Sequence, residues 1–502
     1  MKSAVAFVLA ALIVATAGTA HAFSLVASTL ETPGRTHSVR VADADGDGLK
    51  DVIVSSTTGA PPSQKRVVAV YFAEPGAHPA KPSITTTAPA WACVYDLADV
   101  DGDGKLDLLY FGRDKVAARA IGRSGFGEER VLIAAGSDVL FPDSYRLQGA
   151  PLARNWQGDD AVEIIVPNYN RLVLYTSSGG QFTKDRALPI EMFADQWTGD
   201  YERSPDYIHV TADASIEVSD LRQADYDADG DLDLYVVKEE HIAVFTQDNG
   251  RLSTKPAQSD RFPIRTDDEG RKRNTDVRPI ITDLDGDGYA DLVQAKFGGS
   301  LMDYKSLVRV HRGGPGGLPR TPHFERSSEG FSANIRFDDA DGDGVKDMIF
   351  PVWKVGIMTI VRMLTAKTAS QSFYVHLGQG ASLYQGEASY EIDAAAKYDP
   401  NAGELYGMEP RFGYDFDGDG KPDLLTAPDA ESLEVRLNEG GLNFGDPVAT
   451  VAIPPVEKII IDDFDGDGRA DVYMWYESYR QSKKVVTIWN KADETSAESE
   501  AQ

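Results

Sequence analysis

Four aspartates stand within nine residues in the segment DFDGDGKPD, which begins at Asp415. Positions one, three, five and nine hold Asp415, Asp417, Asp419 and Asp423, and position seven, Lys421, offers its backbone carbonyl. The glycines between them permit a tight turn with positive φ that brings these oxygens together. Hard oxygen donors suit Ca²⁺, whereas zinc requires His or Cys and Mg²⁺ prefers fewer carboxylates and more water. The segment therefore predicts a calcium site.

The motif is repeated along the chain, which has 502 residues. Its seven copies begin at Asp43, Asp99, Asp225, Asp283, Asp339, Asp415 and Asp463. The gap between the second and third copies is about twice the usual spacing, and a degenerate copy fills it. This copy carries Asn155, Gln157, Asp159 and Glu163 in place of the four aspartates, and it lacks the second glycine. The chain therefore contains eight repeat units, which indicates a repeat architecture.

Each unit is rich in predicted strands. An alternating run precedes the loop, a short apolar run follows it, and a second alternating strand, a Gly-rich turn and an edge strand complete the unit. This pattern predicts an all-β fold, a β-propeller of four-stranded blades with the loops in β-hairpins. Eight blades are favoured, and seven remain possible if the degenerate unit or the split terminal unit forms no separate blade. The segment FSLVASTLETPG, from Phe23, resembles a last strand and is expected to complete the C-terminal blade.

An EF-hand is excluded, because position twelve of every loop lacks the required acid and follows a strand. The motif resembles the FG-GAP or VCBS repeat, the calcium-binding blade unit also seen in integrin α-subunit propellers. The resemblance covers about 23–490 and implies about seven Ca²⁺, each held by four aspartates and the carbonyl of position seven. The implied ligands are Asp43, Asp45, Asp47, Leu49 and Asp51; Asp99, Asp101, Asp103, Lys105 and Asp107; Asp225, Asp227, Asp229, Asp231 and Asp233; Asp283, Asp285, Asp287, Tyr289 and Asp291; Asp339, Asp341, Asp343, Val345 and Asp347; Asp415, Asp417, Asp419, Lys421 and Asp423; and Asp463, Asp465, Asp467, Arg469 and Asp471.

Two loops depart from the motif. The loop at Asp225 has Ala228 where a glycine is usual, and we still expect it to bind calcium. The loop at Asn155 carries fewer charges, and we expect weak binding or none.

The first 22 residues combine Lys2, an apolar run and the small-x-small site Ala20-His21-Ala22, which predicts a cleaved secretory signal peptide. Residues 23–490 form the predicted propeller and 491–502 a disordered tail. The expected location is outside the cytoplasm, in the periplasm, at the cell surface or in the medium. The formal net charge of −29 opposes binding to nucleic acid, and no later apolar run is long enough to span a membrane. We expect a monomer, with the lone Cys93 buried and inert.

The calcium sites are interpreted as structural, because bound cations convert the repulsion within each loop into attraction. The predicted function is therefore binding or adhesion to an extracellular protein or polysaccharide, without assigned catalytic residues. A polysaccharide lyase or another glycan-active enzyme is the alternative, with Tyr207 or His209 as acid or base and the basic run Arg271–Arg273 as a carboxylate or sulfate site. Tyr476 and Tyr479 could stack on a sugar, although a core role is favoured. The long insertions at about 136–153, 187–223 and 353–409 are where we expect the ligand.

Overall fold

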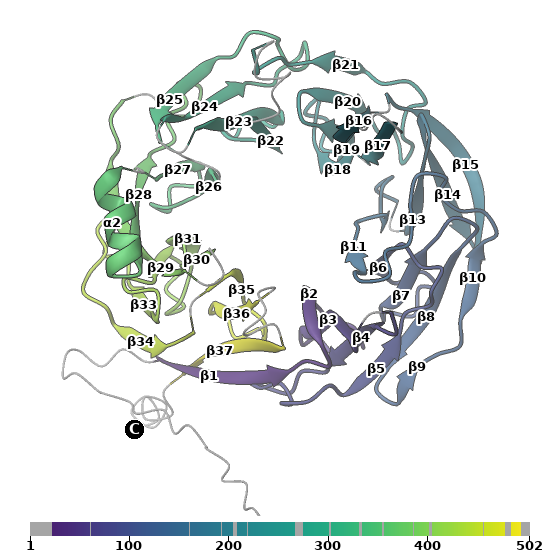
Figure 1. The fold of residues 1–502 in the computed structure, drawn as a ribbon, viewed down its shortest axis with the longest axis horizontal. Helices are drawn as coiled ribbons and strands as arrows, with labels where there is room; N and C mark the ends of the chain where they lie inside the picture. The colour runs from purple at the N-terminus through teal and green to yellow at the C-terminus, as the bar shows by residue number, and fades with distance from the viewer. Residues whose placement is uncertain are drawn as a thin grey trace, which may run out of the picture.

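The computed structural model describes residues 23–492 except 61, 160, 192, 204–207, 218, 267–274, 301–302, 331–333, 354–355, 385, 401–403, 455 and 477–482. Its strands form eight antiparallel blades arranged in a ring around a common axis (Figure 1). The first strand of each blade lies nearest the axis and the fourth lies at the rim. This arrangement confirms the predicted all-β propeller and settles the number of blades at eight.

The first four blades are built from consecutive strands. Blade one contains β2 (Arg35–Ala42), β3 (Asp51–Thr58), β4 (Lys65–Tyr71) and β5 (Ile84–Thr87). Blade two contains β6 (Val94–Ala98), β7 (Asp107–Phe111), β8 (Val116–Gly122) and β10 (Arg130–Ile133), with the short β9 (Gly125–Phe126) on β8 and β11 (Gln148–Gly149) parallel to β6. Blade three contains β12 (Ala153–Arg154), β13 (Glu163–Asn168), β14 (Arg171–Ser178) and β15 (Gln181–Pro189). Blade four contains β18 (Asp220–Ala224), β19 (Asp233–Lys238), β20 (His241–Phe245) and β21 (Gln258–Arg261).

The remaining blades follow the same order of strands. Blade five contains β22 (Thr275–Thr282), β23 (Asp291–Ser300), β24 (Asp303–His311) and β25 (Phe324–Glu329). Blade six contains β26 (Arg336–Asp338), β27 (Asp347–Val352), β28 (Thr368–His376) and β29 (Tyr390–Asp399), followed by the added β30 (Glu404–Tyr406). Blade seven contains β31 (Arg411–Tyr414), β32 (Asp423–Thr426), β33 (Ser432–Arg436) and β34 (Ala449–Ala452). Blade eight contains β35 (Lys458–Asp462), β36 (Asp471–Trp475), β37 (Lys484–Ala492) and β1 (Phe23–Glu31).

Strand β1 closes the ring, as predicted. It pairs with β37 in antiparallel register, from Phe23 opposite Ala492 to Glu31 opposite Lys484. The side chain of Leu30 is completely buried in the cluster that joins blades eight and one. The N-terminal strand therefore protects what would otherwise be the free edge of the last blade.

Apolar side chains fill the spaces between neighbouring blades. The second and third strands are buried on both faces, as in β3 and β4, because each blade packs between two others. One cluster, for example, contains Leu109 of blade two, Ile164 of blade three and Leu234 of blade four, with the buried Trp156 among them. A single blade could not cover both of its faces, so stacking around the ring provides the core.

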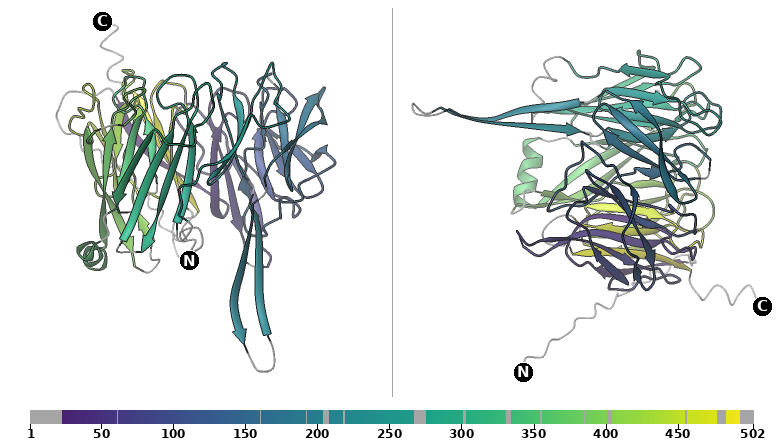
Figure 2. Two further views of the ribbon diagram at one scale, coloured as in Figure 1. Left: turned by 90° about the horizontal axis from the view of Figure 1, so that it is seen from above. Right: turned by 90° about the vertical axis from the view of Figure 1, so that its right-hand side faces the viewer.

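The antiparallel order divides the connections between two faces of the ring. The aspartate-rich loops join first to second strands, so all of them lie on one face, which we call the loop face. Second-to-third and fourth-to-first connections lie on the opposite face. Two large insertions lie there: the hairpin of β16 (Phe193–Arg203) and β17 (Ile208–Glu217), and helix α2 (Ile357–Thr365). Figure 2 shows both on the same side of the ring, with the hairpin extending far from it.

Candidate metal centres

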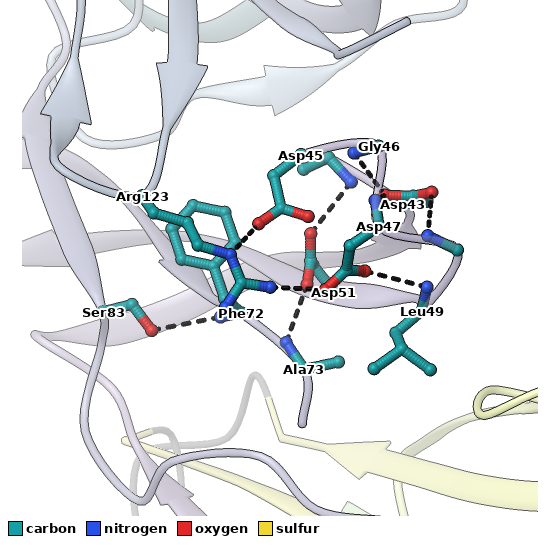
Figure 3. Close-up of polar contacts among 12 residues, drawn as sticks. Asp43, Asp45, Gly46, Asp47, Leu49, Asp51, Phe72, Ala73, Ser83 and Arg123 are labelled. Carbon is teal, nitrogen blue, oxygen red and sulfur yellow. Dashed lines mark hydrogen bonds and ion pairs between the residues drawn. The ribbon is translucent and has the colours of Figure 1, made fainter. Parts of the chain in front are cut away.

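The loop at Asp43 shows how the backbone arranges the carboxylates (Figure 3). Asp43 accepts hydrogen bonds from the N–H groups of Gly46 (2.7 Å), Asp47 (3.2 Å) and Gly48 (2.8 Å). Asp47 accepts one from the N–H of Leu49 at 2.9 Å. Gly46 and Gly48 have φ of 77° and 89°, a left-handed conformation that glycine adopts without steric cost. The turn therefore fixes positions one and five before any ion binds.

The seven loops share this hydrogen-bonding pattern. In each, the N–H groups of positions four and six donate to the carboxylate of position one, and position seven donates to position five. Ala228 adopts φ of 60° to keep the same turn in the loop at Asp225. The turn is thus maintained there although a Cβ disfavours this conformation.

The aspartate at position nine connects its loop to the third strand of the blade. Asp51 is fully buried, and its two oxygens accept hydrogen bonds from the N–H of Ala44 at 2.9 Å and from that of Ala73, after β4, at 2.7 Å. Asp423 is held in the same way by Phe416 (2.8 Å) and Asn438 (3.0 Å). This second anchoring contact is not evident from the motif, because the donor lies about 20 residues further along the chain.

Burial raises the pKa of these position-nine carboxyl groups, and neighbouring carboxylates raise it further. The pKa rises from 3.8 to about 6 for Asp51, and to about 7 for Asp471. Burial also raises the pKa at position three, as at Asp341 and Asp417. Without a cation, each loop therefore disfavours full ionisation, and a bound cation would reverse this effect.

Position three supplies an independent indication that these loops fit a cation. The side chains of Asp45 and Asp285 are 5% and 1% exposed, and in each the Oδ1 atom has no hydrogen-bond partner among the described residues. Asp465 has an unpartnered Oδ1 as well. Carboxylate oxygens of several loops converge to within 4.8 Å of one another, as in the set Asp43, Asp45 and Asp51. A buried oxygen without a donor, aimed at such a cluster, fits a metal ion.

Basic side chains contact positions three and five in several loops. Arg123 of blade two forms ion pairs with Asp45 and Asp47 of blade one (Figure 3). Arg312, after β24, does the same with Asp285 and Asp287 within blade five. The motif does not reveal these arginines, because they lie outside the loops. They supply positive charge where a metal ion would otherwise do so.

The degenerate loop at Asn155 keeps the turn with different groups. Glu163 takes the place of the position-nine aspartate and accepts hydrogen bonds from the N–H groups of Trp156 (2.8 Å) and Gln157 (3.1 Å). Burial raises the pKa of Glu163 to about 7. Because Asn155 and Gln157 replace two aspartates, this loop gathers fewer carboxylates than the intact loops and has less charge for a cation to neutralise.

The other predicted site residues either lie outside the described part of the chain or are buried. Tyr207 and Arg271–Arg273 lie outside the described residues, and so do Tyr479 and the side chain of His209. Tyr476 is buried and donates a hydrogen bond to the Pro454 carbonyl, which excludes sugar stacking by its ring and confirms the core role. Cys93 is buried, as expected, and burial raises the pKa of its thiol. Within the described residues, no helix has the length and apolar character needed to span a bilayer.

The fold and the loops together define a β-propeller with a repeated carboxylate turn. Residues 225–294 and 415–474 match the model of the FG-GAP-like repeat, so this propeller contains FG-GAP-like repeats, as the resemblance of its loops predicted. No curated protein matches the chain.

Solved structures of similar shape include the biofilm matrix protein Bap1 of V. cholerae, with 12% identity, a TM-score of 0.32 and coverage of 93% of this chain and 89% of the other. The Dos1 propeller has 7% identity, a TM-score of 0.44 and coverage of 93% and 95%. The polysaccharide lyase Uly1 has 10% identity, a TM-score of 0.35 and coverage of 90% of both chains.

Proposed function

We propose that residues 23–490 form an exported, calcium-stabilised propeller that acts as a monomeric binding or adhesion module for an extracellular protein or glycan. Calcium is bound in each of the seven intact loops by the aspartates of positions one, three, five and nine and by the carbonyl of position seven. The bound ions neutralise clustered carboxylates, and their binding energy contributes to the stability of the fold.

The observation that carries this proposal is the uniformity of the seven loops. All seven use the same hydrogen-bonding pattern on one face, whatever blade they belong to. A site of catalysis or specific recognition would differ from its copies, whereas a repeated stabilising site need not. The insertions that differ between blades lie on the opposite face, where the hairpin β16–β17 and helix α2 are located. Variable loops on a rigid scaffold are the usual place for ligand binding.

Metal content and thermal unfolding of the protein without its first 22 residues test the proposal. We expect seven Ca²⁺ per chain, a higher melting temperature in Ca²⁺ than in Mg²⁺, and a large decrease on chelation. Asp417→Asn should remove one ion. Asp462→Asn, an exposed aspartate directly before a loop and paired with Lys50, should remove none.

The second half of the test concerns the ligand. The mature protein, loaded with calcium, is applied to arrays of extracellular proteins and glycans, and acidic glycans are followed by absorbance for unsaturated cleavage products. Binding without cleavage is the expected result. Cleavage would contradict a pure binding role. The calcium assignment would be overturned if the protein contained no bound metal and its melting temperature did not change with Ca²⁺.

A further inference from the structure

A cavity of about 570 Å³ lies between the inner strands of blades four, five and six. Its walls come from β18, the end of β19, β22 and the start of β26. Of these, β18, β22 and β26 are the first strands of their blades, which lie nearest the axis of the ring in Figure 1. The volume lies within the range of typical small-ligand sites, roughly 300–1,000 Å³.

The cavity is basic, in contrast to the chain as a whole. Among the described residues that line it, two are acidic, Asp220 and Glu239, and four are cationic, Arg222, Lys238, Arg278 and Arg336. Glu239 is moreover paired with Arg265, which holds the pKa of that carboxyl below its usual value. The lining therefore carries a net charge of about +2, although the formal net charge of the chain is −29.

Contacts with neighbouring side chains hold the arginines of the cavity in place. Arg278 donates a hydrogen bond to the neutral side chain of Asn334 at 2.7 Å and lies 5.1 Å from the ring centroid of Phe297. Arg222 is 53% exposed and lies 3.4 Å from Asp220. A guanidinium group carries several N–H donors in one plane, and this geometry suits bidentate binding of a carboxylate or sulfate.

The positive charge continues into the next blade. Arg336 pairs with Asp338 and donates to the Pro410 carbonyl at 3.2 Å, beside Arg411 of β31. Burial and the charge of Arg336 lower the pKa of Arg411 to about 10. The Nε atom of Arg411 has no hydrogen-bond partner among the described residues. Cations thus follow one another on the first strands of blades four to seven.

The fold keeps this basic region away from the acidic loops. Asp220 begins β18 and Lys238 ends β19, so the cavity is lined by strand ends that point toward the opposite face. Five residues of β18 separate Asp220 from the loop at Asp225, about 17 Å, and three separate Arg222 from it, about 10 Å. Both distances exceed the Debye length of about 8 Å at physiological ionic strength, so the loop charges are partly screened at Arg222 and largely screened at the strand end. The hairpin β16–β17 emerges beside it, immediately before β18.

We propose that this cavity binds an acidic oligosaccharide through its carboxylate or sulfate groups. The proposal rests on the proposed binding function and names its ligand class. Arginines from successive blades match acid groups on successive sugar units, and Asn334 adds an amide suited to hydroxyl groups. The size of the cavity admits a few sugar units, such as a short oligosaccharide or the end of a longer chain. A long polyanion would instead meet repulsion from the strongly acidic molecule.

The test measures binding of three defined probes to the calcium-loaded mature protein by calorimetry: trigalacturonate, a sulfated disaccharide and neutral maltotriose. We expect one or both acidic probes to bind, with an affinity that falls as salt is raised, and maltotriose not to bind. Binding of trigalacturonate alone would identify carboxylate as the ligand group, and binding of the sulfated disaccharide alone would identify sulfate.

Single variants locate the site. Arg278→Gln and Arg222→Gln should each weaken binding of the acidic probe by at least about tenfold, the effect of losing a charged hydrogen-bonded pair. Arg251→Gln removes the same charge from an exposed residue outside the cavity lining, 69% exposed and paired with Asp185, and should have no effect. Asp220→Asn removes the carboxylate that competes for Arg222 and should strengthen binding several-fold, a gain that misfolding cannot produce.

Several results would overturn the proposal. The first is that neither acidic probe binds. The second is that maltotriose binds as tightly as the acidic probes. The third is that both arginine variants bind the acidic probe with unchanged affinity. If the arrays described above reveal a neutral glycan or a protein ligand instead, the binding function stands and the acidic ligand class fails. If the arrays and the probes all show no ligand, the binding function itself fails.

Discussion

Removal of calcium should reverse the pH dependence of stability. In the ion-free protein the position-nine carboxyl groups have pKa values raised above 3.8, to about 6 for Asp51 and about 7 for Asp423. A group whose pKa is higher in the folded than in the unfolded state stabilises the fold at low pH, and this contribution is lost as pH rises through the folded value. Ion-free protein should therefore lose stability between about pH 4 and pH 7.

The size of this loss of stability can be worked out from the pKa shifts. A rise in pKa from 3.8 to about 6, as at Asp51, corresponds to about 3 kcal/mol. Because the tip of the loop, including Asp47, is exposed to water, screening reduces this to about 1.5 kcal/mol per loop. Seven loops then contribute roughly 10 kcal/mol, which is comparable to the whole stability of a typical domain. Ion-free protein should be close to unfolding at about pH 8.

Bound calcium reverses the sign of the pH dependence of stability. The ion lowers the carboxyl pKa values, so protons compete with Ca²⁺ and stability is lost as pH falls instead. The midpoint of urea denaturation, followed by tryptophan fluorescence between about pH 5 and pH 8, should decrease with pH in metal-free protein and increase with pH in calcium. Asp471→Asn should make the slope of the metal-free curve shallower, because one titrating group is gone. Parallel curves with and without calcium would refute this account of the loops.

Two further predictions concern single side chains. Arg312→Gln removes the guanidinium that contacts Asp285 and Asp287, so calcium should bind that loop about two- to fivefold more tightly, as resolved by calorimetric titration. Unchanged affinity would show that this arginine does not compete with the ion. Leu30→Ala, at a fully buried position in the closing strand, should lower the free energy of unfolding by about 2–4 kcal/mol in urea denaturation. Val26→Ala, on the same strand but 42% exposed, should change it by less than about 0.5 kcal/mol. Equal effects of both would mean that β1 does not close the ring as a packed strand.

The metal loops and the ring of blades could be predicted from the sequence because short, local sequence patterns specify them. Nine consecutive residues specify the turn at Asp43, and the positions of the glycines fix its φ angles without reference to the rest of the chain. Closure of the ring by β1 could be predicted too, because the last repeat unit lacks a fourth strand and the segment from Phe23 supplies it. Helix α2 at Ile357–Thr365 could not be predicted in this way, because an apolar segment of this length suits a strand as well as a helix.

Contacts between distant residues could not be read from the motif. Arg123 reaches Asp45 across 78 positions, from the turn after β8 in the neighbouring blade. The basic cavity depends on which side of each inner strand faces its neighbour, and a register shift of one residue would exchange the sides. Arg222 and Arg336 are separated by more than a hundred positions, yet both line it. Spacing along the chain therefore located the metal loops but not the cavity.

The alternation of strand direction explains how one chain can carry both an acidic and a basic site. Every first-to-second connection must lie on the loop face, so repeating the motif adds carboxylates only there. Every insertion after a second or fourth strand must lie on the opposite face, as the hairpin β16–β17 and helix α2 do. Changes in ligand binding can therefore occur through these insertions and through the exposed ends of β18, β22 and β26, while the loops continue to bind the ions on which, in our proposal, the fold depends.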